Sequence, residues 1–67
     1  MYNKRKIGLM EIALKYVEKS YSGDQLMDGD DLYGCSEEDK EMCGEFWVEC
    51  RDDGISNFRK KINKLKA

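Results

Sequence analysis

Apolar residues recur at alternating intervals of three and four positions near both ends of this chain. The first series is Ile7, Met10, Leu14, Val17 and Tyr21, and the second is Ile55, Phe58, Ile62 and Leu65. Such spacing places each series along one face of an α-helix. The 67 residues include no proline, so neither segment contains the residue that most strongly breaks helices. We therefore expect one helix over about residues 3–22 and another from about residue 55 onward.

Residues near these segments indicate how the two helices begin and end. Asn3 can cap the start of the first helix, and Gly23 lies where a left-handed residue would close it. Gly8 either weakens the first turn by about 1 kcal/mol relative to alanine or allows another backbone to approach closely. Asp53 or Ser56 can cap the last helix.

A third helix is expected near the middle of the chain. Ser36 can act as its N-cap, and the acidic residues at 37–39 then occupy the first turn, where the helix dipole favours them. The apolar residues that follow fall on one helical face: Met42, Cys43, Phe46, Trp47 and Cys50. A strand over residues 45–51 is the alternative, because alternate residues there are also apolar and Gly44 weakens a helix. The helix accounts for one more apolar residue and for the cap, so we prefer it.

The segment between the first two of these helices, residues 24–35, shows no sustained period and contains Gly29 and Gly34. We expect a long acidic loop that folds back on the core, in which Asp24 could cap a single helical turn ending near Asp28.

The predicted fold is all-α, with residues 1–67 forming a single small helical domain. It is a small three-helix bundle with a long acidic loop between the first and second helices. The stripes of three amphipathic helices favour near-antiparallel packing at about 20°. Leu9, Ala13 and Tyr16 widen the stripe of the first helix on one side. The alternative fold is α+β, with the short strand at 45–51.

Charge is distributed in three blocks along the chain. Twelve of the fourteen acidic residues lie between Gly23 and Gly54, against only Lys40 and Arg51, so this block carries about −10. The residues before it carry about +3 and those after it about +5. The net charge of −2 therefore conceals a basic, acidic, basic order.

The composition argues against catalysis. The chain has no histidine, the side chain that most often serves as a general base, and no lysine-bearing glycine loop for phosphate. A bundle of this length has little room for a ligand pocket of about 300 Å³ or more. We expect no enzymatic activity, no catalytic residue and no cofactor.

Neither the cysteines nor the aspartates match a metal site. Cys35, Cys43 and Cys50 are eight and seven positions apart, unlike the ligands of structural zinc sites. A calcium loop with Gly29 at its sixth position would place Leu26 at a ligand position, so that match fails. We expect no metal site, and we interpret Cys43 and Cys50 as small core residues with reduced thiols.

An odd number of cysteines is typical of a reducing compartment, so a cytoplasmic location is expected. The N-terminal apolar run is interrupted by Glu11 and is too short to span a membrane, and we expect no membrane partner.

The sequence is consistent with three functional hypotheses. The first is a small regulatory or inhibitory protein that docks an acidic face on a basic protein surface, such as a nucleic-acid-binding groove. Small phage inhibitors of host enzymes are similar in size and charge, although no motif links them to this chain. The second is nucleic-acid binding through the basic C-terminal helix. The third is homo-oligomerisation, because a thin core with heptad stripes would gain from a second copy.

Each hypothesis designates its own residues. The acidic face would comprise Asp28, Asp30, Asp31, Glu41, Glu45 and Glu49. Its apolar anchors would be whichever of Met27, Tyr33, Phe46 and Trp47 is exposed. A nucleic-acid site would comprise Arg59, Lys60, Lys61 and Lys64.

Overall fold

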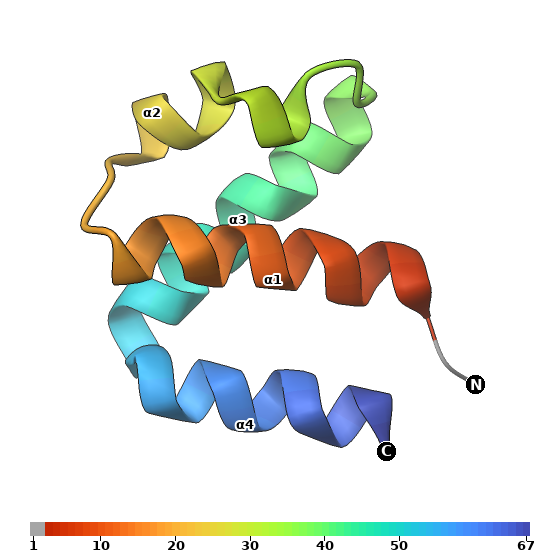
Figure 1. Cartoon of the computed structure of the whole chain (residues 1–67), viewed down its shortest axis with the longest axis vertical. Coiled ribbons are helices and arrows are strands. Elements are labelled where there is room, and N and C mark those ends of the chain that lie inside the picture. Colours follow the sequence, from red (N-terminus) through yellow and green to blue (C-terminus); the bar gives the residue numbers. More distant parts are fainter. Residues whose placement is uncertain (1–2) are drawn as a thin grey trace.

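The computed structural model describes residues 3–67 (Figure 1). It contains the helices α1 (Lys4–Glu18), α2 (Gly23–Asp28), α3 (Glu37–Asp53) and α4 (Ile55–Lys66), with a 3-10 turn η1 (Asp30–Leu32) between α2 and α3. The all-α prediction is confirmed. The alternative strand at 45–51 is wrong, since α3 covers all of these residues and no strand occurs among residues 3–67.

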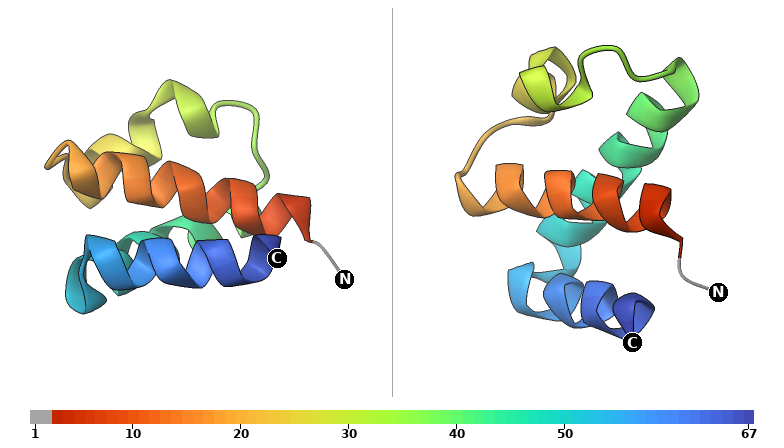
Figure 2. Two further views of the ribbon diagram at one scale, coloured as in Figure 1. Left: turned by 60° about the horizontal axis from the view of Figure 1, so that its bottom comes forward. Right: turned by 45° about the vertical axis from the view of Figure 1, so that its right-hand side comes forward.

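Helix α1 lies in the middle of the molecule (Figure 1). Helix α4 runs antiparallel beside it, α2 and η1 lie on its opposite side, and α3 crosses behind it. Figure 2 shows the crossing from two further directions. The expected near-antiparallel packing therefore describes α1 and α4, whereas α3 crosses α1 steeply.

The apolar residues of α1 form two rows that serve two separate clusters. One row joins α4 and the C-terminal half of α3 in a cluster of Ile7, Met10, Leu14, Cys50, Phe58 and Ile62. The other row joins α2, η1 and the N-terminal half of α3 in a cluster of Leu9, Ala13, Tyr16, Leu26, Leu32 and Cys43. Phe46 packs against both clusters. The residues expected only to widen the first stripe thus form a second core.

The end of α1 differs from the prediction. Ser20 adopts a left-handed conformation with φ 62°, and its amide donates to the Val17 carbonyl at 3.0 Å. The Tyr21 amide donates to the Tyr16 carbonyl at 2.9 Å. These two bonds form a Schellman motif in which serine stands where glycine is usual. The prediction that Gly23 closes the helix is wrong, because Gly23 begins α2.

The other helix ends follow the capping rules in part. The Asn3 side chain caps α1 and the Ser36 side chain caps α3, as predicted. No side chain caps α4, so the expected role of Asp53 or Ser56 is wrong. The chain instead turns the corner between α3 and α4 at Gly54, whose φ of 97° suits glycine.

The expected long loop is largely helical. The Ser22 hydroxyl accepts a hydrogen bond from the backbone amide of Gln25, and Gln25 Oε1 accepts one from the backbone amide of Ser22. These two bonds form a reciprocal capping box at the start of α2. Ser22 therefore caps this helix, and Asp24 does not. Leu26 and Leu32 are completely buried and anchor α2 and η1 on α1 and α3.

Gly29 separates α2 from η1 and lies directly against the ring of Tyr16. A Cβ at this position would overlap the Tyr16 hydroxyl oxygen and lie 2.9 Å from Cζ. The φ of Gly29 is −73°, which any residue can adopt, so the requirement for glycine is steric. This contact keeps the α2–η1 segment close to α1.

Replacing Gly29 with alanine should therefore destabilise the protein by about 1–3 kcal/mol, because the buried Tyr16 ring has to move. Gly44→Ala is the matched control. Its Cβ would meet only the flexible end of Met27, 2.8 Å away, and alanine favours helix. Thermal unfolding by circular dichroism should show a lower Tm for Gly29→Ala and little change for Gly44→Ala. Equal losses in both variants would contradict the steric account.

Gly8 stands in the interior of α1, and a Cβ there would meet no atom of residues 3–67 within 4 Å. The suggested close approach of another backbone is therefore wrong. Gly8→Ala should stabilise the fold by about 0.5–1 kcal/mol, through higher helix propensity and a less flexible unfolded chain. The control, Gly54→Ala, should destabilise it because φ is positive there. Urea denaturation measures both, and a lower midpoint for Gly8→Ala would count against this expectation.

Candidate acidic interaction surface

Four of the six acidic residues designated from the sequence are exposed and uncompensated. Asp28 and Asp30 lie at the junction of α2 and η1, and Glu41 and Glu45 lie one turn apart on α3. Among residues 3–67, none of the four has a basic partner within 4.0 Å or a hydrogen bond to its carboxylate. Their charges are therefore directed to solvent.

The other two designated residues serve the fold. The Asp31 carboxylate accepts a hydrogen bond from Lys15 Nζ at 3.1 Å. The pKa of Asp31 is lowered, chiefly by this bond and then by the hydroxyl of Tyr16. Glu49 accepts from Lys61 Nζ at 2.7 Å. The first carboxylate joins η1 to α1, and the second joins α3 to α4.

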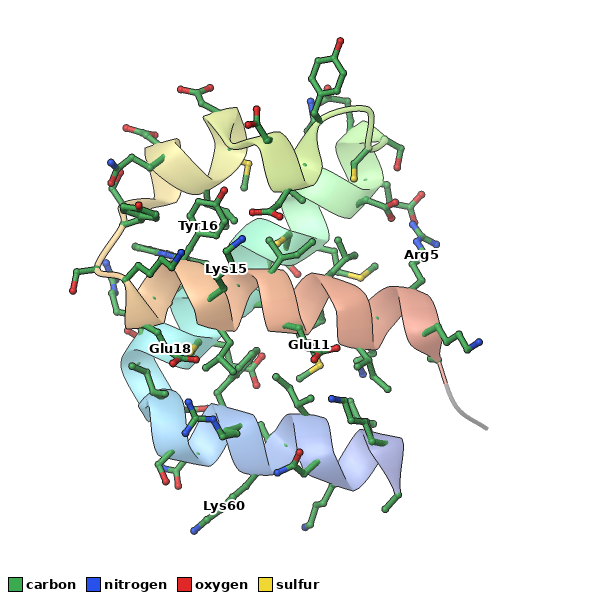
Figure 3. All side chains as sticks on the ribbon, viewed as in Figure 1. Arg5, Glu11, Lys15, Tyr16, Glu18 and Lys60 are labelled. Atoms are coloured by element: carbon green, nitrogen blue, oxygen red, sulfur yellow. The ribbon has the colours of Figure 1, made fainter. Side chains whose placement is uncertain are left out.

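Helix α1 compensates charge on both of its sides. Its bases reach the acidic part of the chain, where Arg5 pairs with Asp39 and Lys15 with Asp31. Its acids reach the basic helix, where Glu11 pairs with Lys66 at 3.1 Å and Glu18 with Arg59 at 3.2 Å. Figure 3 shows Arg5 and Lys15 on the side of α2 and the N-terminal half of α3, and Glu11 and Glu18 toward α4. These four charged residues of α1 thus each lie beside a residue of opposite charge.

Seven carboxylates have no basic partner among residues 3–67, and all of them come from one stretch of the chain. They are Asp24, Asp28, Asp30, Glu37, Glu38, Glu41 and Glu45. We name this set the acidic surface. It belongs to α2, η1 and the N-terminal half of α3, which lie on the side of α1 opposite α4 (Figure 1). Lys40 is the one base within this stretch.

Sequence reasoning missed three members of this surface, Asp24, Glu37 and Glu38. They were interpreted as turn and capping residues because they stand in the first turns of helices. The ion pairs of the other acids could not be read from the order of residues. Partners such as Arg5 and Asp39 are 34 positions apart.

Tyr33 is the one exposed residue of the four proposed anchors. It lies between η1 and α3, and 89% of its surface is accessible. Trp47 is half-buried, where its Nε1 donates to the Tyr21 carbonyl at 3.3 Å and the Arg51 guanidinium covers its ring. Met27 and Phe46 are half-buried against the core clusters. Tyr33 therefore projects an aromatic ring from the edge of the acidic surface.

The residues of the nucleic-acid alternative are only partly available. Arg59 pairs with Glu18, and Lys61 bonds both Glu49 and Asp53. The pKa of Lys61 is raised by these bonds, first by that to Asp53. Lys60 and Lys64 have no acidic partner among residues 3–67. Half of the proposed phosphate-binding charge is thus already compensated within the protein.

The cysteines belong to the core, as predicted for Cys43 and Cys50. Both are completely buried, Cys35 is half-buried, and all three are free thiols. Cys43 Sγ donates to the Leu9 carbonyl at 3.4 Å, and burial raises the pKa of its thiol to about 11. Burial also raises the pKa of Cys50. Thiols held in this protonated state are poor nucleophiles.

Within residues 3–67, no three cysteine or carboxylate side chains gather closely enough to hold a metal ion. None of the helices in this part of the chain has the length and apolar character needed to cross a membrane. Comparison of the chain with protein-family models, with curated proteins and with solved structures finds no match.

Proposed function

We propose that the protein is a small non-catalytic regulatory or inhibitory protein that docks its acidic surface on a basic surface of another protein. The observation that carries this proposal is the segregation of uncompensated charge. Seven carboxylates without partners occupy one side of α1, while most other acids in residues 3–67 are paired.

Like charges held together destabilise a compact protein through mutual repulsion. The chain has bases that pair elsewhere, and α1 brings Arg5 and Lys15 to this side of the molecule. Those bases pair with Asp39 and Asp31, at the inner border of the acidic surface. The seven carboxylates of the acidic surface have no such base among residues 3–67 and face solvent. Such a surface attracts a positively charged partner.

The rigidity of α3 adds to this fit. Glu37, Glu41 and Glu45 follow one another at intervals of four residues, about 6 Å along a helix axis. A row of carboxylates fixed at this spacing can occupy a groove that binds phosphates in the partner. The finer form of the proposal is therefore a partner whose basic surface is a nucleic-acid-binding groove.

Tyr33 supplies the apolar contact that a charged surface lacks. Tyrosine is enriched among the interface residues that contribute most to affinity, and its ring loses little entropy on binding. Its position beside Asp30 and Glu37 lets charge steer the approach while the ring fills a pocket of the partner.

The test compares two double variants with the same change of charge and residue type. Glu41→Gln with Glu45→Gln removes two carboxylates of the acidic surface. Glu11→Gln with Glu18→Gln removes two that pair with α4. Protein captured from the native host by the unsubstituted chain should bind the first variant about tenfold more weakly and the second nearly unchanged. Circular dichroism should show equal helicity in both.

A third variant, Tyr33→Ala, should weaken the same complex without altering its dependence on salt. Displacement of nucleic acid from the captured partner by this protein would support the groove as the docking surface. Equal affinity of both double variants for the captured partner would overturn the role of the acidic surface. A mobility shift of DNA or RNA by the protein alone, lost when Lys60 and Lys64 become glutamine, would favour the nucleic-acid alternative.

A further inference from the structure

A cavity of about 300 Å³ opens between α1, α3 and α4, on the side of α1 away from α2. Its lining residues are Lys6, Met10, Phe46, Glu49, Lys61, Lys64 and Leu65. Its volume exceeds what the length of the chain predicts, which is little room for a pocket of about 300 Å³. The cavity forms because α3 crosses α1 while α4 runs beside it, so the three helices diverge.

Three of the seven residues that line this cavity are apolar: Met10, Phe46 and Leu65. Met10 is 3% exposed and Phe46 is half-buried, and both also belong to the packing of the core between α1 and α4. Leu65 is 38% exposed. An apolar group placed here would remove exposed surface of Phe46 and Leu65 from water, which favours binding.

The other four lining residues are charged, three lysines and one glutamate. Lys61 is held by Glu49 at 2.7 Å and Asp53 at 2.6 Å, so its charge is compensated within the protein. Lys6 and Lys64 have no carboxylate within 4.0 Å among residues 3–67. They come from two different helices of the lining, α1 and α4. The single carboxylate of the lining, Glu49, is already bonded to Lys61.

Apolar lining residues together with two lysines that are unpaired within residues 3–67 favour one class of ligand over others. A cation would be repelled by Lys6 and Lys64, and a small inorganic anion would leave the apolar lining residues uncovered. A neutral apolar molecule would gain nothing from the two lysines. The volume is at the lower end of the range for ligand sites, which fits one ring or a short alkyl chain.

We propose that this cavity binds a small amphipathic carboxylate. Its aliphatic or aromatic body lies against Met10, Phe46 and Leu65, and its carboxylate lies between Lys6 and Lys64. The site is separate from the acidic surface and does not depend on the proposed function.

The experiment is a titration of the labelled protein with octanoate, followed by two-dimensional amide NMR. Octanol and octylammonium are the controls, since they share the alkyl chain and differ in the charge of the head group. Octanoate should shift the amides around Met10, Phe46 and Leu65 with saturation. Octanol should bind more weakly, and octylammonium should produce no saturable shift. Octanol binding as tightly as octanoate would overturn the role of the lysines.

A matched pair of variants isolates the role of Lys6 and Lys64. Lys6→Gln with Lys64→Gln should weaken octanoate binding about three- to tenfold, the range for loss of two exposed charge contacts. Lys4→Gln with Lys60→Gln makes the same change on the same two helices, outside the cavity. Lys60 projects away from α1 in Figure 3. If octanoate binding weakened equally in both double variants, the loss would be due to the change in net charge, and the proposed site would be overturned.

Filling the cavity provides a second, independent measurement. Leu65→Trp places a larger side chain at a position that is already partly exposed, so the fold should be retained, as checked by Tm. Octanoate binding should then be lost. Binding that persists would overturn the proposed location. Shifts of the same amides on raising the protein concentration without octanoate would identify a second copy as the occupant, and would overturn the carboxylate.

Discussion

Burial of α1 on two opposite sides is the constraint on which the rest of this structure depends. Neither apolar row of the helix could be covered by α3 alone, because α3 crosses α1 and meets each row over only part of its length. The first row therefore needs α4, and the second needs α2 with η1. A chain of 67 residues can bury only a limited share of its surface. Because α1 contributes residues to both clusters, two of its faces are buried instead of one.

The same central position organises the electrostatics. A uniformly basic α1 would pair with the acidic middle of the chain and repel α4. Its mixed composition avoids this conflict, because Glu11 and Glu18 face α4 while Arg5 and Lys15 face the other side. Exposed ion pairs of this kind contribute only about 0–1 kcal/mol each. Their larger effect is to set which charges stay unpaired, and so where another molecule would be attracted.

The local part of this fold could be predicted from the sequence, and the tertiary part could not. Periodicity identified α1, α3 and α4, and the caps at Asn3 and Ser36 followed from side chains that bond their own neighbours. The capping box of Ser22 and Gln25 was also visible, but Gly23 was interpreted as the end of the preceding helix. The sequence around Ser20 contains no signal for its left-handed conformation. In the structure this conformation occurs together with packing of the Tyr21 ring on the Tyr16 ring.

Part of the candidate site could likewise be predicted from the sequence, and part could not. The acidic character of residues 24–53 follows directly from the sequence. Which of these carboxylates stay unpaired depends on partners as distant in sequence as Arg5 and Asp39, which are 34 positions apart. The cavity also escaped prediction, because it arises from the angle between helices and not from any local pattern. From the sequence, Lys61 and Lys64 were candidates for phosphate contact, and nothing placed them in one cavity with Lys6.

Phe46 gives this small fold a further property. Its ring packs against both clusters and also lines the cavity between α1, α3 and α4. The two clusters therefore cannot lose their packing independently, and unfolding should proceed as one cooperative unit. An occupant of the cavity would stabilise that unit as a whole, including the distant helical segment that presents the carboxylates. The thermodynamic linkage between the two ends of the molecule would then pass through α1, α3 and the ring of Phe46, which the two clusters share.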